Sequence, residues 1–168
     1  MKINKLQKKI GISFKDDKLL IQALTHKSFD TKNNYEKLEF LGDRVLGFVI
    51  SKKLLELYPN EKVGMIDKKL ANLVNKNKCF EIGKELELDN YILTGNTEKK
   101  KKVNIEKKII SDCCESLIGA IYIDKGFEVS SKFILNYWKN YLNLSDITVI
   151  DSKTCLLYTS DAADDVAS

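Results

Sequence analysis

Acidic side chains recur inside two otherwise apolar stretches of this sequence, at spacings that could bind a metal ion. In the first stretch, Glu36, Glu39 and Asp43 are three and four residues apart. In a helix they would share one face, with Cβ atoms about 5–6 Å apart. In the second stretch, Asp112 and Glu115 stand one helical turn apart. Because carboxylates are seldom buried alone, two such helices facing each other predict a carboxylate cage for hard divalent cations.

The three acids of the first stretch also have structural interpretations. Glu36 stands three residues after Asn33, which is the place of a capping-box glutamate. Glu39 could form a salt bridge with a lysine. Asp43 follows a glycine in a helix interior, where aspartate is a poor helix former, so we expect a partner to hold it there.

The acids of the second stretch are better metal candidates. No basic residue lies between Lys108 and Lys125, which disfavours a salt bridge. Oxygen ligands alone suit Mg²⁺, with Mn²⁺ as its substitute, whereas zinc prefers histidine or cysteine. The one histidine, His26, is not placed as in a helical di-iron site, and we assign it a structural role.

The predicted metal indicates the kind of reaction. Mg²⁺ usually binds few carboxylates together with substrate phosphate, which favours phosphodiester hydrolysis by a metal-activated water. The sequence has no glycine-rich nucleotide-binding loop. We therefore expect a nucleic-acid backbone as substrate and no nucleotide cofactor.

Helices must position these acids, and the sequence predicts an all-α domain. Apolar periodicity, with proline and glycine as stop signals, predicts helices that contain residues 19–24 and span about 34–57, 63–75, 78–88, 104–124 and 127–142. Ser13 and Asp16 form a predicted capping pair before the first of them. Gly42 and Gly47 weaken the second helix by roughly 1 kcal/mol each relative to alanine. We interpret them as sites where another helix approaches closely.

The bulk composition favours one soluble domain with a polyanionic partner. The chain has 168 residues, 43% of them hydrophobic, and a net charge of +4, enough for one core. Without the last fifteen residues, 28 basic residues face 21 acidic ones, which suits nucleic acid. Four cysteines without a C-x-x-C pair indicate reduced thiols and a cytoplasmic protein. No signal segment or membrane-length apolar run is present, so we expect no membrane partner.

Lysines near these stretches are candidate contacts to the phosphate backbone. They are Lys68, Lys69, Lys99, Lys100, Lys101, Lys102, Lys107 and Lys108. The run of four could equally be a solvated loop, because its like charges repel and resist packing.

The end of the chain differs from the rest. Residues 1–144 carry all the predicted helices and form the predicted domain. We interpret residues 145–168 as a linker remnant and an unstructured tail. Its last part, 154–168, has no lysine and resembles translated adapter read-through, so we assign it no function.

Two motifs resemble those of the ribonuclease III family. Residues 35–43, Tyr-Glu-Lys-Leu-Glu-Phe-Leu-Gly-Asp, are similar to the family motif E-R-L-E-F-L-G-D, and residues 23–28, Ala-Leu-Thr-His-Lys-Ser, match the segment before it. Residues 112–120, Asp-Cys-Cys-Glu-Ser-Leu-Ile-Gly-Ala, resemble the second motif, D-x-x-E-A-L-I-G-A. On these motifs the chain is identified as a member of the family over roughly residues 5–143.

The resemblance implies an all-helical endonuclease domain that forms a homodimer and cuts both strands of double-stranded RNA. The implied reaction uses Mg²⁺, leaves 5′-phosphate and 3′-hydroxyl ends, and serves RNA processing such as ribosomal RNA maturation. By position, Glu39, Asp112 and Glu115 hold metal, while Asp43 and Glu115 are essential to the chemistry. Glu36 is an additional site acid, and Phe40 and Leu41 lie on a helix similar to the family's dimer interface.

The sequence departs from the family pattern at Lys37, Arg44 and Leu70, none of which removes a metal ligand. Bacterial members usually continue into a double-stranded-RNA-binding domain, and the chain changes character where it should begin, which we interpret as truncation. Two alternatives stay open. One is a catalytically inactive dimerising RNA-binding or ribosome-associated module, which the intact acids disfavour. The other is a short ribonuclease III-like enzyme that lacks the binding domain.

Overall fold

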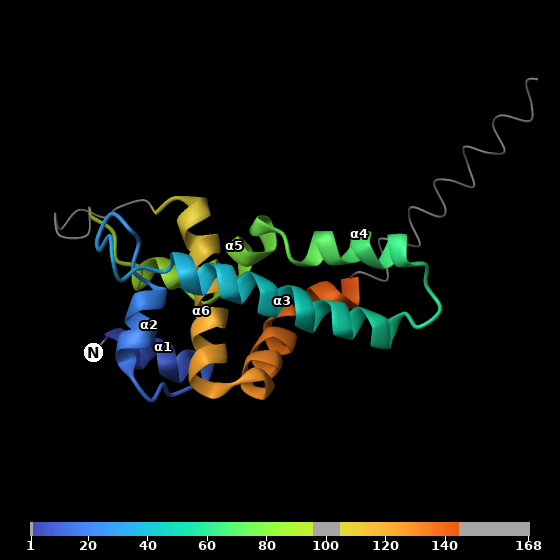
Figure 1. Ribbon diagram of the computed structural model, residues 1–168, viewed down its shortest axis with the longest axis horizontal. Helices are drawn as coiled ribbons and strands as arrows, with labels where there is room; N and C mark the ends of the chain where they lie inside the picture. The colour runs from blue at the N-terminus through green and yellow to red at the C-terminus, as the bar shows by residue number, and fades with distance from the viewer. Residues whose placement is uncertain (1, 96–104, 145–168) are drawn as a thin grey trace, which may run out of the picture. The chain divides into compact units, whose positions relative to one another are not determined.

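The computed structural model describes residues 2–95 and 105–144, and the described parts are helical (Figure 1). The elements are α1 (Lys2–Ile10), α2 (Asp17–Ala23), α3 (Glu36–Leu57), α4 (Val63–Leu73), α5 (Lys76–Glu85), the 3₁₀ turn η1 (Leu88–Asn90), α6 (Lys107–Lys125) and a last helix over residues 127–144. Within these ranges β structure is limited to an isolated bridge between Thr25 and Leu93. The predicted all-α fold is confirmed.

The start of the chain is where the sequence prediction is least accurate. Helix α1 was not expected, although Leu6 and Ile10 are four residues apart and both buried. The predicted capping pair is wrong, because Asp16 is itself the N-cap of α2. Its carboxylate accepts the Lys18 backbone N–H at 2.9 Å, so the helix begins after Asp16 and not at Ser13.

Helices α3 and α6 cross in direct backbone contact (Figure 1). Every residue of α6 from 110 to 121 is buried. A Cβ on Gly42 would stand 1.7 Å from the Glu115 carbonyl oxygen, and one on Gly119 would stand 2.2 Å from that of Leu38. Any side chain at either glycine would therefore separate the helices. This close approach brings the acids of α3 and α6 together.

The second glycine of α3 behaves differently. A Cβ on Gly47 would meet no atom of the described residues within 4 Å, and the neighbouring Phe48 is exposed. The interpretation that another helix approaches both glycines is confirmed for Gly42, whereas no helix of the described residues approaches Gly47.

A short backbone pairing ties the end of α2 to the segment after η1. Leu93 donates its N–H to the Leu24 carbonyl at 2.8 Å, and His26 donates its N–H to the Leu93 carbonyl at 2.9 Å. His26 Nδ1 lies 2.7 Å from Ser28 Oγ, and its ring centroid is 5.6 Å from that of Tyr35. These contacts give His26 a structural part beside the start of α3.

The chain divides into two compact units, residues 1–137 and 138–168. The first contains the labelled elements α1 to α6 and η1. Of the second, residues 138–144 are described, and they are helical. Among the helices of the described residues, none has the length and apolar character needed to cross a membrane.

Candidate metal centre

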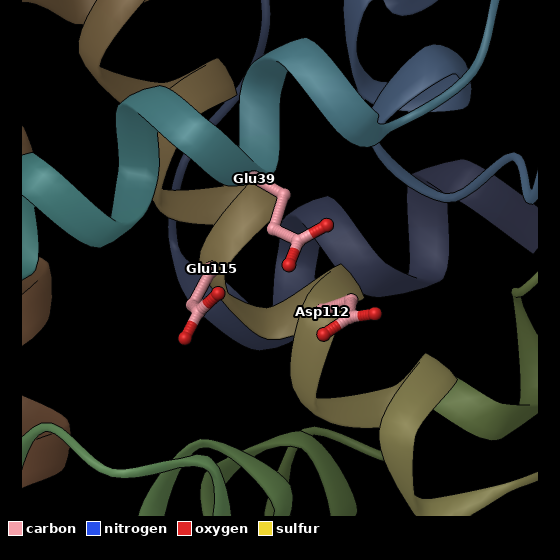
Figure 2. A group of neighbouring side chains, drawn as sticks. All are labelled: Glu39, Asp112 and Glu115. Carbon is pink, nitrogen blue, oxygen red and sulfur yellow. The ribbon is translucent and has the colours of Figure 1, made fainter.

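Three carboxylates from two helices converge at one point (Figure 2). Glu39 extends from the first turn of α3, and Asp112 and Glu115 extend from α6. One ligand oxygen of each lies within 4.8 Å of the others. The Asp112 and Glu115 side chains are 1% and 2% exposed, and that of Glu39 is 24% exposed. The structure thus brings together the three residues predicted as metal ligands, in an arrangement that could hold a metal ion.

A lysine from a third helix lies among these acids. The Lys76 ammonium nitrogen is 2.9 Å from Glu39 Oε1, 2.7 Å from Asp112 Oδ1 and 2.7 Å from Glu115 Oε2. Asn75 starts the helix that carries this lysine, because its side-chain oxygen accepts a backbone N–H of the first turn of α5 at 3.0 Å. The buried carboxylates therefore have a cationic partner, without which their burial would be costly.

This ion-pair network corrects one inference from the sequence. The lack of basic residues between Lys108 and Lys125 disfavours a salt bridge at the α6 acids, yet the structure has one there. The partner comes from α5, which spacing within α6 does not reveal. For Glu39, the salt bridge to a lysine that the sequence left open is present. Sequence reasoning missed Lys76, since a lysine after a capping asparagine carries no sign of its partners.

The remaining oxygens of the two α6 acids have partners of their own. Lys108, one helical turn before Asp112, donates to Asp112 Oδ2 at 2.8 Å, and the Tyr35 hydroxyl donates to the same oxygen at 3.4 Å. The Cys79 thiol donates to Glu115 Oε1 at 3.6 Å. Lys108 was predicted as a phosphate contact, and in the structure it pairs with a proposed metal ligand.

Burial and ion pairing act in opposite directions on the pKa values of these groups. Burial would raise the pKa of Asp112, but hydrogen bonds from Lys108 and Lys76 outweigh it and lower that pKa below its ordinary value. At Glu115 burial prevails over Lys76 and raises the pKa. Burial lowers the pKa of Lys76, but its bonds to the three carboxylates outweigh this and raise it. Lys76 is therefore protonated at neutral pH.

The other predicted site acids lie at the rim of the cluster. Asp43 pairs with the adjacent Arg44, which supplies the partner expected for it, and Glu36 pairs with Lys27 at 3.2 Å. A cavity of about 330 Å³ is lined by Glu36, Glu39, Phe40, Asp43, Arg44, Lys76 and Glu115. Asp43 thus borders the same cavity as Glu115 but is not one of the three converging carboxylates.

The capping role considered for Glu36 does not form. The N-cap of α3 is Tyr35, which makes no side-chain cap hydrogen bond. Instead, the Asn34 side-chain oxygen accepts the Glu36 backbone N–H at 3.1 Å. The Glu36 carboxylate is therefore left facing the cavity and Lys27.

The predicted phosphate-contacting lysines lie in different environments. Lys68 and Lys107 are exposed. Lys69 is 6% exposed, and its ammonium lies 4.1 Å from the centroid of the Tyr58 ring. In this position Lys69 does not present its charge to solvent as a phosphate contact requires. Residues 99–102 lie outside the described residues.

Comparisons with known proteins find the family that the two sequence motifs resemble. The family model described as Ribonuclease-III-like matches residues 16–142. Ribonuclease 3 of Pelagibacter ubique (strain HTCC1062) is 60% identical over 158 residues, which cover 93% of this chain and 71% of that protein. Ribonuclease 3 of Hahella chejuensis (strain KCTC 2396) is 41% identical over 158 residues, 92% of this chain and 69% of that protein.

Solved structures agree with this assignment. The nuclease domain of ribonuclease III from Campylobacter jejuni matches with a TM-score of 0.76 and 37% identity, over 82% of this chain and 96% of that one. A second structure of that nuclease domain gives a TM-score of 0.74 and 36% identity, over 82% of this chain and 94% of that one. The fold is that of a helical nuclease domain. The chain belongs to the ribonuclease III family, and the predicted enzyme class, an endoribonuclease of the ribonuclease III type, is confirmed.

Proposed function

We propose that this chain is a metal-dependent endoribonuclease that hydrolyses phosphodiester bonds of double-stranded RNA. The observation that carries the proposal is the convergence of Glu39, Asp112 and Glu115, whose ligand oxygens lie within 4.8 Å of one another. An all-oxygen donor set fits Mg²⁺, with Mn²⁺ as its substitute. The products have 5′-phosphate and 3′-hydroxyl ends, and the cellular role is RNA processing such as ribosomal RNA maturation.

The side chains of the site have different roles in the proposed reaction. Glu39, Asp112 and Glu115 hold the cation, which when bound supplies activation of a water and neutralisation of phosphate charge. Asp43 acts from the cavity rim, where its half-exposed carboxylate orients the attacking water once it parts from Arg44. Glu115, whose side chain is 2% exposed, keeps its carboxylate directed at the cluster and is, with Asp43, essential to the proposed reaction.

We further propose that the chain forms a homodimer through α3. Phe40, Phe48 and Leu55 are 64%, 62% and 59% exposed, and spacings of eight and seven residues place them on one side of the helix. Leu41 beside them is partly exposed. A row of exposed apolar side chains favours burial against a second copy. One similar Campylobacter jejuni structure is described as having a region involved in dimer formation.

The proposed RNA contacts are lysines. Lys68 and Lys107 are exposed and are joined in the proposal by residues 99–102, which the structure does not describe. Replacing Lys68 and Lys107 with glutamine lowers affinity on all duplexes alike and flattens the dependence of log affinity on log salt by about 0.7–0.9 per lost contact. A filter-binding series over salt concentration measures this slope. An unchanged slope would mean that these two lysines do not contact the RNA backbone.

We assign the nuclease domain to residues 1–144 and the linker and tail to residues 145–168. For the compartment we propose the cytoplasm. Cys79, Cys113 and Cys114 are buried and unbridged, which suits a reducing environment.

Cleavage of long duplex RNA with and without metal tests the reaction. The purified chain cuts in Mg²⁺ or Mn²⁺ and stops in excess chelator. Glu115→Gln is expected to keep the fold, since the amide has the shape of the carboxylate and Lys76 retains Glu39 and Asp112 as partners, but it abolishes cleavage, because an amide cannot replace the carboxylate charge at the metal. Glu56→Gln is the matched control, because Glu56 is half exposed and pairs with Lys52 and Lys53. Full activity in chelator would overturn the proposed metal dependence. Near-normal turnover of Glu115→Gln would mean that the catalytic site lies elsewhere.

Sedimentation of the wild type and Phe40→Ala tests the dimer. The wild type is expected to sediment as a dimer. Phe40→Ala is expected to reduce the free energy of association more than the free energy of monomer unfolding, because the ring is largely exposed in the single chain. A wild-type protein that is active and strictly monomeric at micromolar concentration would contradict the dimer.

A further inference from the structure

The Lys76 ammonium occupies the centre of the proposed metal site. It is within 2.9 Å of one oxygen from each of the three proposed ligands. A divalent cation bound to the same oxygens would stand within about 4 Å of the ammonium, and the two cations would repel each other strongly in this enclosed setting. Lysine and metal are therefore alternatives at one position.

The lysine has room to leave this position, whereas the two acids of α6 are enclosed. The Lys76 side chain is 52% exposed, in contrast to the enclosed carboxylates of α6. It borders the cavity shared with the rim acids, so space to withdraw lies beside it. Lys76 is also the first residue of α5, and the partial positive charge of a helix N-terminus disfavours a cation there. The ammonium is held in place by the three carboxylates against the field of its own helix.

The second cation of the cluster differs in this respect. Lys108 contacts the other oxygen of Asp112, Oδ2, from within the same helix, while Lys76 contacts Oδ1. A cation bound among the three carboxylates would not compete with Lys108 for the same oxygen. Displacement is therefore specific to Lys76.

We propose that Lys76 is a displaceable counter-cation of the metal site. It pairs with Glu39, Asp112 and Glu115 when metal is absent, and it withdraws into the cavity when a divalent cation enters. This inference rests on the proposed metal-dependent function. Two consequences follow: the metal-free site stays assembled in spite of its buried acids, and the metal binds more weakly than the three carboxylates alone would allow.

Titration of Mn²⁺ into the metal-free protein, followed by calorimetry, tests the competition. Lys76→Met removes the charge and keeps most of the length of the side chain, and it is expected to bind Mn²⁺ at least about tenfold more tightly, since no ion pairs are broken on entry. Without metal, its melting temperature is lower than that of the wild type. Saturating Mn²⁺ raises the melting temperature of the variant by more than it raises that of the wild type. Lys84→Met is the matched control: Lys84 lies on the same helix, is 48% exposed and pairs with Asp89 at 2.7 Å. It should leave Mn²⁺ affinity unchanged.

A second measurement uses the wild type alone, so it does not depend on a variant that folds. Lysines are acetylated briefly with and without saturating Mn²⁺, and each site is quantified by mass spectrometry. Acetylation of Lys76 rises several-fold with Mn²⁺, because its ammonium is released from the carboxylates, while that of Lys84 stays constant. A Lys76→Met protein that folds only with Mn²⁺ supports the proposal. If it folds in neither condition, the acetylation result decides.

The outcomes separate this inference from the function on which it rests. If the wild type and Lys84→Met bind no Mn²⁺, the proposed metal site fails. If both bind Mn²⁺ but Lys76→Met binds it equally or more weakly, or Lys76 acetylation is unchanged or falls with Mn²⁺, the metal site stands and the displaceable counter-cation is overturned.

Discussion

Two groups of carboxylates lie close together at the proposed metal site and are held in opposite ways. The acids of α6 are enclosed, with Asp112 and Glu115 at 1% and 2% exposure and the Lys76 ammonium shared between them. The rim acids of α3 face solvent. Glu36 and Asp43 are 54% and 40% exposed, and each pairs with a surface cation. The charges are the same, but their surroundings differ.

This difference decides how firmly each acid is fixed. An exposed ion pair contributes about 0–1 kcal/mol, whereas removing one partner of a buried pair costs about 3–5 kcal/mol. The enclosed acids are therefore held in place before any metal binds, and the rim acids reorient at little cost. The rigid part of the site therefore lies on α6, and the adjustable part lies on the outer face of α3.

The largest expected effect comes from replacing one acid of each group and measuring cleavage. Asp112→Asn keeps the shape and removes the charge, so single-turnover cleavage of duplex RNA in Mg²⁺ should fall on the order of 10³-fold, or about 4 kcal/mol. Glu36→Gln removes a charge that solvent already screens and should change the rate less than about tenfold. Circular dichroism checks that both fold. Equal losses would erase the distinction between enclosed and rim acids.

The next effect concerns the packing that encloses the α6 acids. Gly42→Ala pushes a methyl group into the Glu115 carbonyl, so the free energy of unfolding should fall by about 3 kcal/mol. Gly47→Ala, on the same helix, meets no described atom within 4 Å and should raise it by about 0.5–1 kcal/mol, as alanine favours the helix. Urea denaturation at one protein concentration measures both. A tolerated Gly42→Ala would show that the helices can separate without loss.

These two glycines also show what the sequence could predict. Both give the same local signal, a weak point in a helix, and what distinguishes them is whether α6 passes by. Spacing of three and four residues is local as well, so it predicted which acids share a face. The partner of those acids could not be predicted in this way, because Lys76 is 37 residues from Glu39 and 36 from Asp112 in the chain. Local periodicity predicts the helices, but tertiary packing determines which residues of other helices they contact.

A smaller effect separates two neighbouring lysines of α6. Lys108 holds an enclosed carboxylate, but its own side chain is 76% exposed, so solvent screening reduces a charged hydrogen bond to about 1 kcal/mol. Lys108→Met should lower the free energy of unfolding by that amount without metal. Lys107→Met, next to it and also exposed, should change it by less than about 0.5 kcal/mol. Equal values from urea denaturation would mean that Lys76 alone compensates Asp112.

The smallest effect tests an exposed acid held mainly by backbone N–H groups, in the loop before α3. The Asp30 carboxylate accepts the N–H groups of Asn33 at 2.9 Å and Lys32 at 2.8 Å, and these bonds lower its pKa below the ordinary 3.8. A lowered folded-state pKa stabilises the protein above the ordinary value, and this contribution is lost as pH falls through the folded-state value. Asp30→Asn should therefore reduce the urea midpoint at pH 6, with the gap to the wild type closing toward pH 3. Asp67→Asn, an exposed aspartate on α4, controls for loss of a surface charge. A gap that stays constant with pH would assign the Asp30 contribution to the shape of the turn and not to its charge.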